Sequence, residues 1–180
     1  MSFYSVCYKL FVNFFKKVYN IEVIGAENEP QSGAVIAACN HISNSDVIIM
    51  AAAMKRQVRY MAKAELFKVP GLKQLISALG AFPVDRGGND VGAIKKTITI
   101  LKDGEMVGLY PQGTRFTGVD PRETKPKNGV GMIALRSGAA VLPVSIVTKG
   151  NKIKLFKKNY VIIGKPIDVS SIDKIGRAHV

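Results

Sequence analysis

The sequence predicts an α/β fold, a single-domain sandwich of helices around a mostly parallel β-sheet. Short apolar runs typical of buried strands alternate with stretches that have helical patterns. The chain has 180 residues, of which 47% are hydrophobic, enough for one sizeable core. One long polar stretch, residues 111–128, interrupts the alternation. Loops of that length inside a compact domain are usually functional or disordered, and we favour a functional loop.

The predicted strands are short apolar runs bounded by polar or turn-forming residues. They cover residues 21–24, 34–39, 58–61, 81–84, 106–110, 140–147, 153–156 and 160–163. The predicted helices cover residues 47–54, 71–79, 91–101 and 129–137. Asp90 is the expected N-cap of the third helix, and Gly104 is expected to stop it.

Residues 1–20 are predicted to form an amphipathic helix that associates with a membrane. Between residues 2 and 20 the polar residues recur every three or four positions and form one narrow stripe. The broad aromatic arc that remains, with lysines at its edge, favours a helix lying in the membrane interface. The alternative is a helix docked on the domain's own core. The chain has no run of 18 apolar residues, so we expect no membrane-spanning helix.

Charge and cysteine content indicate the partner and the compartment. With 26 basic and 13 acidic residues, the net charge is +13, which should attract an anionic partner. Charge alone does not choose among nucleic acid, phospholipid headgroups and a phosphorylated substrate. Recognised RNA-binding signatures are absent, so we expect no nucleic-acid partner, and the N-terminal helix favours a phospholipid surface. Cys7 and Cys39 are too few to frame a disulfide-stapled fold. We therefore predict a peripheral or monotopic membrane protein on the cytoplasmic face.

The last six residues, 175–180, are predicted to be a non-native tail translated from a sequencing adapter. The folded domain is then expected to span residues 21–174, and the natural chain to continue beyond Lys174. Without this tail His41 is the only histidine, so no histidine metal cluster is expected.

His41 and Asp46 form the most informative pair of residues. They lie in Asn-His-Ile-Ser-Asn-Ser-Asp, directly after a predicted strand. A histidine can accept a proton near neutral pH, and a carboxylate can hold its ring in one tautomer. The alternative is a capping box, in which Ser43 and Asp46 satisfy backbone donors at the start of the next helix. Spacing alone does not choose between these roles, and Asp46 can serve both.

Two more polar stretches follow predicted strands. Residues 80–86 bring Arg86 just past one strand, and residues 110–115, Tyr-Pro-Gln-Gly-Thr-Arg, follow another. A Gly-Thr-Arg turn can offer backbone N–H groups, a hydroxyl and a guanidinium to one phosphate. Taken singly, each arginine is better explained as a solvated surface charge. Because ligands bind at the carboxyl ends of parallel strands, we expect His41, Arg86 and this turn to share one edge of the sheet.

In order and context, these stretches resemble the motifs of the glycerolipid acyltransferase family, specifically the 1-acyl-sn-glycerol-3-phosphate acyltransferases. His41 to Asp46 is similar to the HX4D first motif. Residues 63–70 and 80–86 resemble the second motif, residues 110–115 the third and residues 141–144 the fourth. HX4D alone is weak, but four motifs in the right order are specific. The resemblance covers residues 21–167.

The resemblance implies transfer of an acyl group from acyl-CoA or acyl-carrier protein to the sn-2 hydroxyl of lysophosphatidic acid. The product is phosphatidic acid, made for phospholipid synthesis, and no cofactor or metal is implied. On this pattern His41 is the general base, Asp46 orients its imidazole, and the hydroxyl attacks the thioester without an acyl-enzyme. The residues implied in binding the acceptor phosphate are Lys63, Arg86, Gly113, Thr114 and Arg115.

One departure from the family pattern is Gln112, where the third motif usually carries Glu. Glutamine keeps a carbonyl acceptor but loses the charge, so activity or acceptor choice depends on whether that charge is essential. The alternatives are an acyltransferase for another lysolipid and a non-catalytic basic module that binds membranes.

Two other enzyme classes are disfavoured. Residues 129–134 fit the dinucleotide fingerprint G-x-G-x-x-A but follow a polar stretch rather than a strand. The chain also has no G-x-S-x-G elbow of a serine hydrolase.

Overall fold

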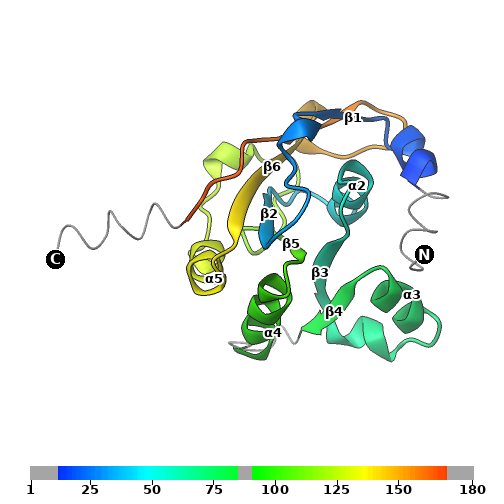
Figure 1. Ribbon diagram of the computed structural model, residues 1–180. Helices are drawn as coiled ribbons and strands as arrows, with labels where there is room; N and C mark the ends of the chain where they lie inside the picture. Colours follow the sequence, from blue (N-terminus) through cyan, green and yellow to red (C-terminus); the bar gives the residue numbers. More distant parts are fainter. Residues whose placement is uncertain (1–11, 85–90, 170–180) are drawn as a thin grey trace.

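The computed structural model describes residues 12–84 and 91–169. Within them, seven strands form one sheet with the order β1-β7-β6-β2-β5-β3-β4. They are β1 (Ile21–Ile24), β2 (Val35–Cys39), β3 (Val58–Lys63), β4 (Ala81–Val84), β5 (Met106–Leu109), β6 (Ala140–Thr148) and β7 (Asn159–Ile163). β6, β2, β5, β3 and β4 run parallel, whereas β7 is antiparallel to β6. The predicted single-domain α/β fold with a mostly parallel sheet is confirmed (Figure 1).

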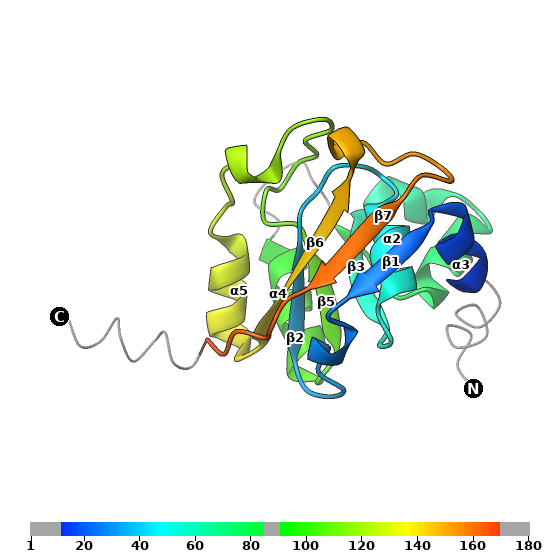
Figure 2. The same ribbon diagram turned by 90° about the horizontal axis from the view of Figure 1, so that it is seen from above.

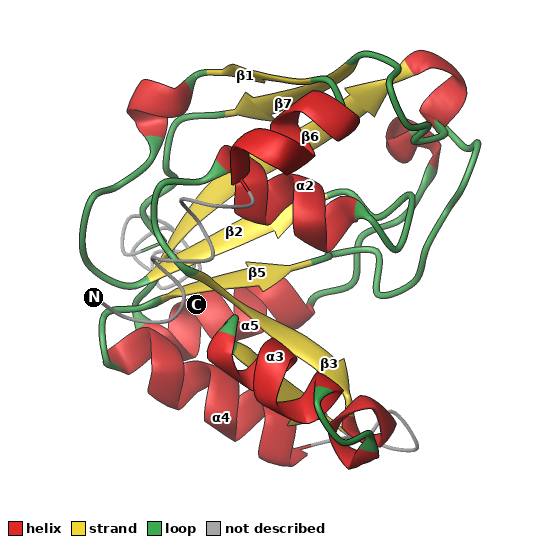
Figure 3. Cartoon of the chain, turned by 90° about the vertical axis from the view of Figure 1, so that its right-hand side faces the viewer, coloured by secondary structure: helices red, strands yellow, loops and turns green. Residues whose placement is uncertain are grey.

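Helices cover both faces of this sheet. α2 lies on one face together with the helical residues 12–18, and α4 and α5 lie on the other (Figure 1, Figure 2). α3 packs beside β4 (Figure 1), and it lies at the same end of the sheet as β3 (Figure 3). The bounds are α2 (Asp46–Ala53), α3 (Leu72–Ala78), α4 (Val91–Lys102) and α5 (Gly129–Ser137), with short 3-10 turns η1 (Ala26–Asn28), η2 (Ala64–Lys68), η3 (Pro121–Glu123) and η4 (Lys149–Asn151).

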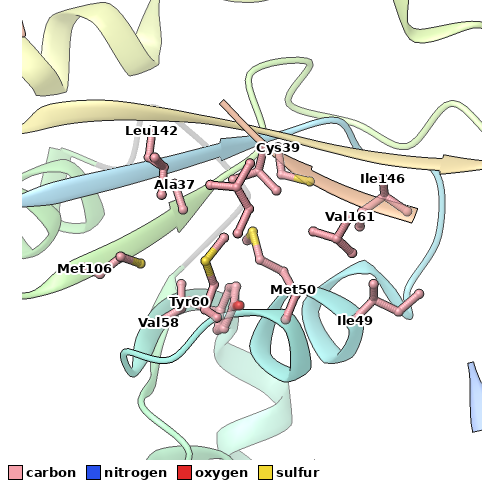
Figure 4. Packing of buried hydrophobic residues seen from close by; sticks show 14 of the residues in the cluster. Ala37, Cys39, Ile49, Met50, Val58, Tyr60, Met106, Leu142, Ile146 and Val161 are labelled. Atoms are coloured by element: carbon pink, nitrogen blue, oxygen red, sulfur yellow. The ribbon is translucent and has the colours of Figure 1, made fainter. Parts of the chain in front are cut away.

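The central strand β2 shows why a layer forms on each face. Val35, Ala37 and Cys39 belong to the core cluster under α2, whereas Ile36 belongs to the cluster under α4 and α5. These four side chains are at most 1% exposed. A strand buried on both faces needs a continuous apolar run rather than an alternating one, as this sequence has. Figure 4 shows the first cluster, enclosed between the sheet and α2.

Gly108 in β5 allows α2 to approach the sheet closely. A Cβ atom at this position would lie 2.6 Å from the Tyr60 ring and 2.8 Å from the Met50 methyl group. Such distances are too short for non-bonded carbon atoms, so a side chain here would displace α2 or β3. The glycine leaves this space to Met50 and Tyr60, which both belong to the core cluster.

The ends of most predicted elements are confirmed to within two residues, which is the usual uncertainty of element boundaries. The predicted strand at residues 153–156 is wrong. Thr148 pairs with Asn159 in the β6–β7 register, so residues 149–158 form the connecting loop of this hairpin, which we call the hairpin loop. Its apolar residues imitate a strand pattern, but Gly150, Asn151 and Phe156 have positive φ angles of 68°, 51° and 59°.

The N-terminal segment is docked on the core over the part that the structure describes. Residues 12–18 are helical, and Phe15 and Val18 pack against the core cluster under α2. Tyr19 is buried, and its hydroxyl donates to Ser45 Oγ at 3.1 Å. Phe14, in contrast, is 57% exposed. Residues 1–11 and the expected N-cap Asp90 lie outside the described residues.

No helix among residues 12–84 and 91–169 is long and apolar enough to cross a bilayer.

Candidate active site

The candidate site lies at the carboxyl end of β2. Asn40, the first residue after this strand, makes two hydrogen bonds to the backbone of Ile146 in β6. Its Nδ2 donates to the Ile146 carbonyl at 3.0 Å, and its Oδ1 accepts from the Ile146 N–H at 2.7 Å. These paired bonds continue the β2–β6 contact beyond the last residue of the strand. The chain therefore turns away at a defined point, directly before His41.

The structure brings His41 and Asp46 together. His41 Nδ1 lies 2.7 Å from Asp46 Oδ2, and the same oxygen accepts the N–H groups of Ile42 at 2.7 Å and Ser43 at 2.9 Å. The Asp46 side chain is 0% exposed and that of His41 is 16% exposed. An imidazole that donates its Nδ1 proton to a carboxylate has a free lone pair on Nε2. This tautomer can accept a proton from a substrate.

The capping alternative is also partly correct, because Asp46 serves both roles. α2 begins at Asp46, which reaches back to the Ser43 N–H as the acidic residue of a capping box does. The Ser43 hydroxyl accepts from the Ser45 N–H at 3.1 Å. The turn that starts α2 and the carboxylate that holds the imidazole are thus one local structure.

Two neutral side chains, Tyr110 and Cys39, lie next to the His41–Asp46 pair. The Tyr110 ring stacks on the His41 ring, with centroids 4.1 Å apart and an interplanar angle of 21°. Burial is the main cause that raises the pKa of Tyr110 well above its ordinary value, so the phenol stays neutral. Burial likewise raises the pKa of the Cys39 thiol, which is 1% exposed. Cys39 therefore lacks the thiolate character of a nucleophilic cysteine.

Gln112 connects the loop after β5 to the backbone of His41. Its Oε1 accepts the His41 N–H at 2.6 Å, and its Nε2 donates to Thr124 Oγ1 at 2.8 Å. The Thr124 hydroxyl in turn donates to the Pro121 carbonyl at 2.6 Å. Gln112 is 6% exposed. Both ends of the amide are used in this chain of bonds, and a carboxylate would have no proton for Thr124.

Further hydrogen bonds join three loops at this edge of the sheet. The Phe116 N–H donates to the His41 carbonyl at 2.8 Å, and the Thr117 hydroxyl donates to the Ile42 carbonyl at 2.6 Å. The Gly118 N–H donates to the Asn151 carbonyl of the hairpin loop at 2.9 Å. The loops after β2 and β5 and the hairpin loop are therefore held in one arrangement.

A hollow of about 570 Å³ opens between these loops. It is lined by Ile42, Ser43, Asn44, Arg115, Thr117, Lys152, Ile153 and Lys154. Arg115, Lys152 and Lys154 carry positive charge, and the lining has no acidic side chain. These charges would attract an anionic group to the hollow. The hollow is close to His41 in the sequence, because the next residue, Ile42, lines it.

The sequence predicted Arg115 at such a site but not its two lysine neighbours. Lys154 lies in the expected strand at residues 153–156 and Lys152 directly precedes it, and the hairpin loop brings both to Arg115. Lysine and apolar residues alternate after Gly150-Asn151. This alternation is typical of a strand as well as of a loop that presents lysines on one side, so it does not by itself indicate a site.

The other predicted phosphate-binding residues are more dispersed. Gly113 and Thr114 lie in the exposed turn before Arg115. The backbone φ at Gly113 is 68°, a conformation that favours glycine. Lys63 is the exposed last residue of β3 and is not among the residues that line the hollow. Arg86 lies outside the described residues.

The structure does not place the dinucleotide-like residues directly after a strand. Residues 129–134 open α5, and the residues just before them are irregular rather than a strand. Within residues 12–84 and 91–169, no group of three or more His, Cys, Asp or Glu side chains could hold a metal ion.

Comparison with known proteins identifies the class. The model of the family described as Acyltransferase matches residues 20–147. This chain belongs to the acyltransferase family, and the resemblance that the four motifs indicated is confirmed.

Within that family, the chain is similar to 1-acyl-sn-glycerol-3-phosphate acyltransferases. It is 33% identical to the one of Bacillus subtilis over 89% of this chain and 82% of the relative. With that of Borreliella burgdorferi it shares 32% identity over 78% of this chain and 55% of the relative. The crystal structure of the 1-acyl-sn-glycerophosphate (LPA) acyltransferase of Thermotoga maritima superposes with a TM-score of 0.69 and 26% identity, over 94% of this chain and 74% of that chain.

Proposed function

We propose that this protein transfers a fatty acyl group from a thioester donor to the sn-2 hydroxyl of lysophosphatidic acid and forms phosphatidic acid. The donor would be acyl-CoA or acyl-carrier protein, with no cofactor. The observation that carries the proposal is the contact of His41 with the buried Asp46 carboxylate, next to a basic hollow. Support comes from the relatives named 1-acyl-sn-glycerol-3-phosphate acyltransferase.

The proposed reaction needs one general base. His41 Nε2 removes the proton of the acceptor hydroxyl while its oxygen attacks the thioester carbonyl carbon. The tetrahedral intermediate expels the thiolate, which takes the proton back from the imidazolium and leaves as a thiol. Asp46 holds the ring in the required tautomer and lies against the positive charge that forms on it. The acyl group passes directly to the acceptor, so the neutral, buried Cys39 has no part in the chemistry.

The acceptor phosphate would bind through the basic hollow. Arg115 would supply a guanidinium to the phosphate, helped by the turn at Gly113 and Thr114. Lys152 and Lys154 line the same hollow and add to its positive charge. Lys63 and Arg86 stay as proposals from the second motif. The hydrophobic acyl chain then has to extend away from these charges.

Gln112 in place of the usual glutamate is compatible with this proposal. Its contacts are to the His41 backbone and to Thr124, so it supports the loop that carries the catalytic base. On this view, the residue at 112 contributes an acceptor oxygen, which glutamine retains.

The proposed enzyme would work as a peripheral or monotopic protein on the cytoplasmic face of a membrane. Residues 1–20 would form the amphipathic, membrane-associating segment and residues 21–174 the catalytic domain. Residues 175–180 would contribute nothing as a non-native tail.

The test is an acceptor and donor panel on the purified chain. Lysophosphatidic acid and other lysolipids are offered with acyl-CoA or acyl-carrier protein, and ester formation is followed by mass spectrometry. We expect turnover with lysophosphatidic acid. His41→Ala should lose it by about 10²- to 10⁴-fold and recover part of it with free imidazole. Preference for another lysolipid would move the acceptor assignment, and no turnover with any pair would support a non-catalytic module. Unchanged turnover in a folded His41→Ala protein would contradict the general base.

A further inference from the structure

The tip of the hairpin loop presents an exposed apolar pair between lysines. We define the hairpin tip as residues 154–157, Lys-Leu-Phe-Lys. Leu155 is 54% exposed and Phe156 is 71% exposed, the highest exposure among the large hydrophobic residues described. Ile153, which directly precedes the tip, packs against the core cluster under α2. The loop is thus anchored on one side while its tip faces solvent.

The exposure of Phe156 is maintained by the fold. Its φ of 59° lies in the left-handed region, which is unfavourable for a bulky side chain. Its N–H donates to the Val18 carbonyl at 2.7 Å, which joins the tip to the end of the helical residues 12–18. A strained aromatic residue that is tied down and still exposed needs a reason other than folding, and such strain often accompanies function.

The neighbouring surface has the same character. Phe14 is 57% exposed and belongs to the helix whose last residue, Val18, is bonded to the tip. Within the tip, Lys154 and Lys157 flank the apolar pair, and Lys17 is exposed on the helix. Aromatic and aliphatic side chains framed by lysines match the boundary of an anionic bilayer, where rings enter the acyl region and ammonium groups meet phosphates.

The hairpin tip also adjoins the basic hollow, because Lys152, Ile153 and Lys154 line it. We propose that the hairpin tip inserts into the surface of an anionic bilayer and so holds the mouth of the hollow at the level of the lipid headgroups. This inference extends the proposed function, since it explains how an acceptor embedded in the bilayer reaches His41. Vesicle binding by itself does not depend on turnover, so the two proposals can fail separately.

The direct test uses the absence of tryptophan from the chain. Phe156→Trp introduces a single reporter at the tip of the full-length protein. Its emission should move to shorter wavelength on phosphatidylglycerol vesicles, and brominated lipids should quench it. The matched control is Leu135→Trp on α5, because Leu135 is also 54% exposed but lies on the opposite side of the sheet. Equal responses of the two reporters, or no response at position 156, would overturn the proposal.

Variants of the tip give the second test. Leu155→Ser combined with Phe156→Ser should weaken binding to these vesicles by on the order of 10-fold, whereas Leu135→Ser should not. Lys157→Gln should weaken binding roughly fivefold on phosphatidylglycerol but not on phosphatidylcholine. Acyl transfer to a short-chain lysophosphatidic acid, kept below its critical micelle concentration, should stay unchanged in the double variant. Unchanged vesicle binding, or loss only of binding to acyl-carrier protein, would overturn membrane insertion.

Discussion

The segment that carries His41 and the hollow that carries Arg115 are built in opposite ways. Asp46 is 0% exposed, accepts two backbone N–H groups and holds the imidazole at 2.7 Å. Arg115, Lys152 and Lys154 are exposed and come from two loops far apart in the sequence. A proton acceptor has to be held in one tautomer, which needs a rigid, buried carboxylate. Charges that attract an anion from water have to remain accessible.

The comparison separates two kinds of defect. Damage to the buried segment should lower turnover, and damage to the hollow should lower affinity for the acceptor. Gln112 belongs to neither region, because it joins the loop after β5 to the backbone of His41.

Asp46→Asn is expected to have the largest effect. The amide keeps an oxygen for the backbone N–H groups but removes the charge that holds the imidazole, so kcat should fall by on the order of 10²-fold. KM should change little. The control is Asp120→Asn, a carboxylate in the loop after β5 that binds Arg122. kcat and KM are measured for both variants, and a wild-type kcat for Asp46→Asn would show that the charge of Asp46 is not needed.

Arg115→Ala should weaken the hollow and leave the His41–Asp46 pair intact. Loss of a charge-assisted contact to phosphate should raise KM for the acceptor roughly 10- to 100-fold while kcat changes less. Arg122→Ala is the matched control, since Arg122 belongs to the same connection but pairs with Asp120 at 2.6 Å. Arg115→Lys should recover only part of the affinity, because it loses the bidentate fork. A fall in kcat without a rise in KM would count against the phosphate role.

Gln112→Ala tests the connection between the regions. The His41 N–H would lose its acceptor, which should lower the free energy of unfolding by about 1–3 kcal/mol. Gln112→Glu keeps an acceptor oxygen and should lose less. Gln31→Ala, at an exposed glutamine, should stay within about 0.5 kcal/mol of the parent. Urea denaturation measures all three, and equal stability of the two Gln112 variants would show that the bond to His41 is unimportant.

The smallest effect is expected away from both regions, at the Arg59–Glu105 pair between β3 and the start of β5. Hydrogen bonding to Arg59 lowers the pKa of Glu105. A carboxyl whose pKa is lower in the folded state stabilises the protein above its unfolded pKa, and this contribution is lost as pH falls through the folded pKa. Glu105→Gln should therefore flatten the acid side of the stability curve, by about 0.2–1 kcal/mol for so exposed a pair. A double-mutant cycle with Arg59→Gln checks it, since additive effects would mean that the pair is not coupled.

Local sequence patterns were sufficient for most of the fold. The continuous apolar run at residues 34–39 predicts a buried strand, which the structure has as Val35–Cys39, and α5 has the predicted bounds Gly129–Ser137. The strand expected at residues 153–156 failed because its apolar pattern is local, whereas the β6–β7 register is decided by pairing Thr148 with Asn159. Lys152 and Lys154 were missed as neighbours of Arg115 for the same reason.

The sequence by itself indicated the class of protein and singled out the His41–Asp46 pair, because motif order and the spacing of these two residues are local properties of the chain. Only the tertiary structure decided that Asp46 serves the helix start and the imidazole together, and that Gln112 bonds to the His41 backbone. It also decided that the hairpin loop supplies lysines to the hollow and leaves Phe156 exposed. The physical reason is that burial and hydrogen bonding depend on residues distant in sequence, whose proximity is set by strand order and register.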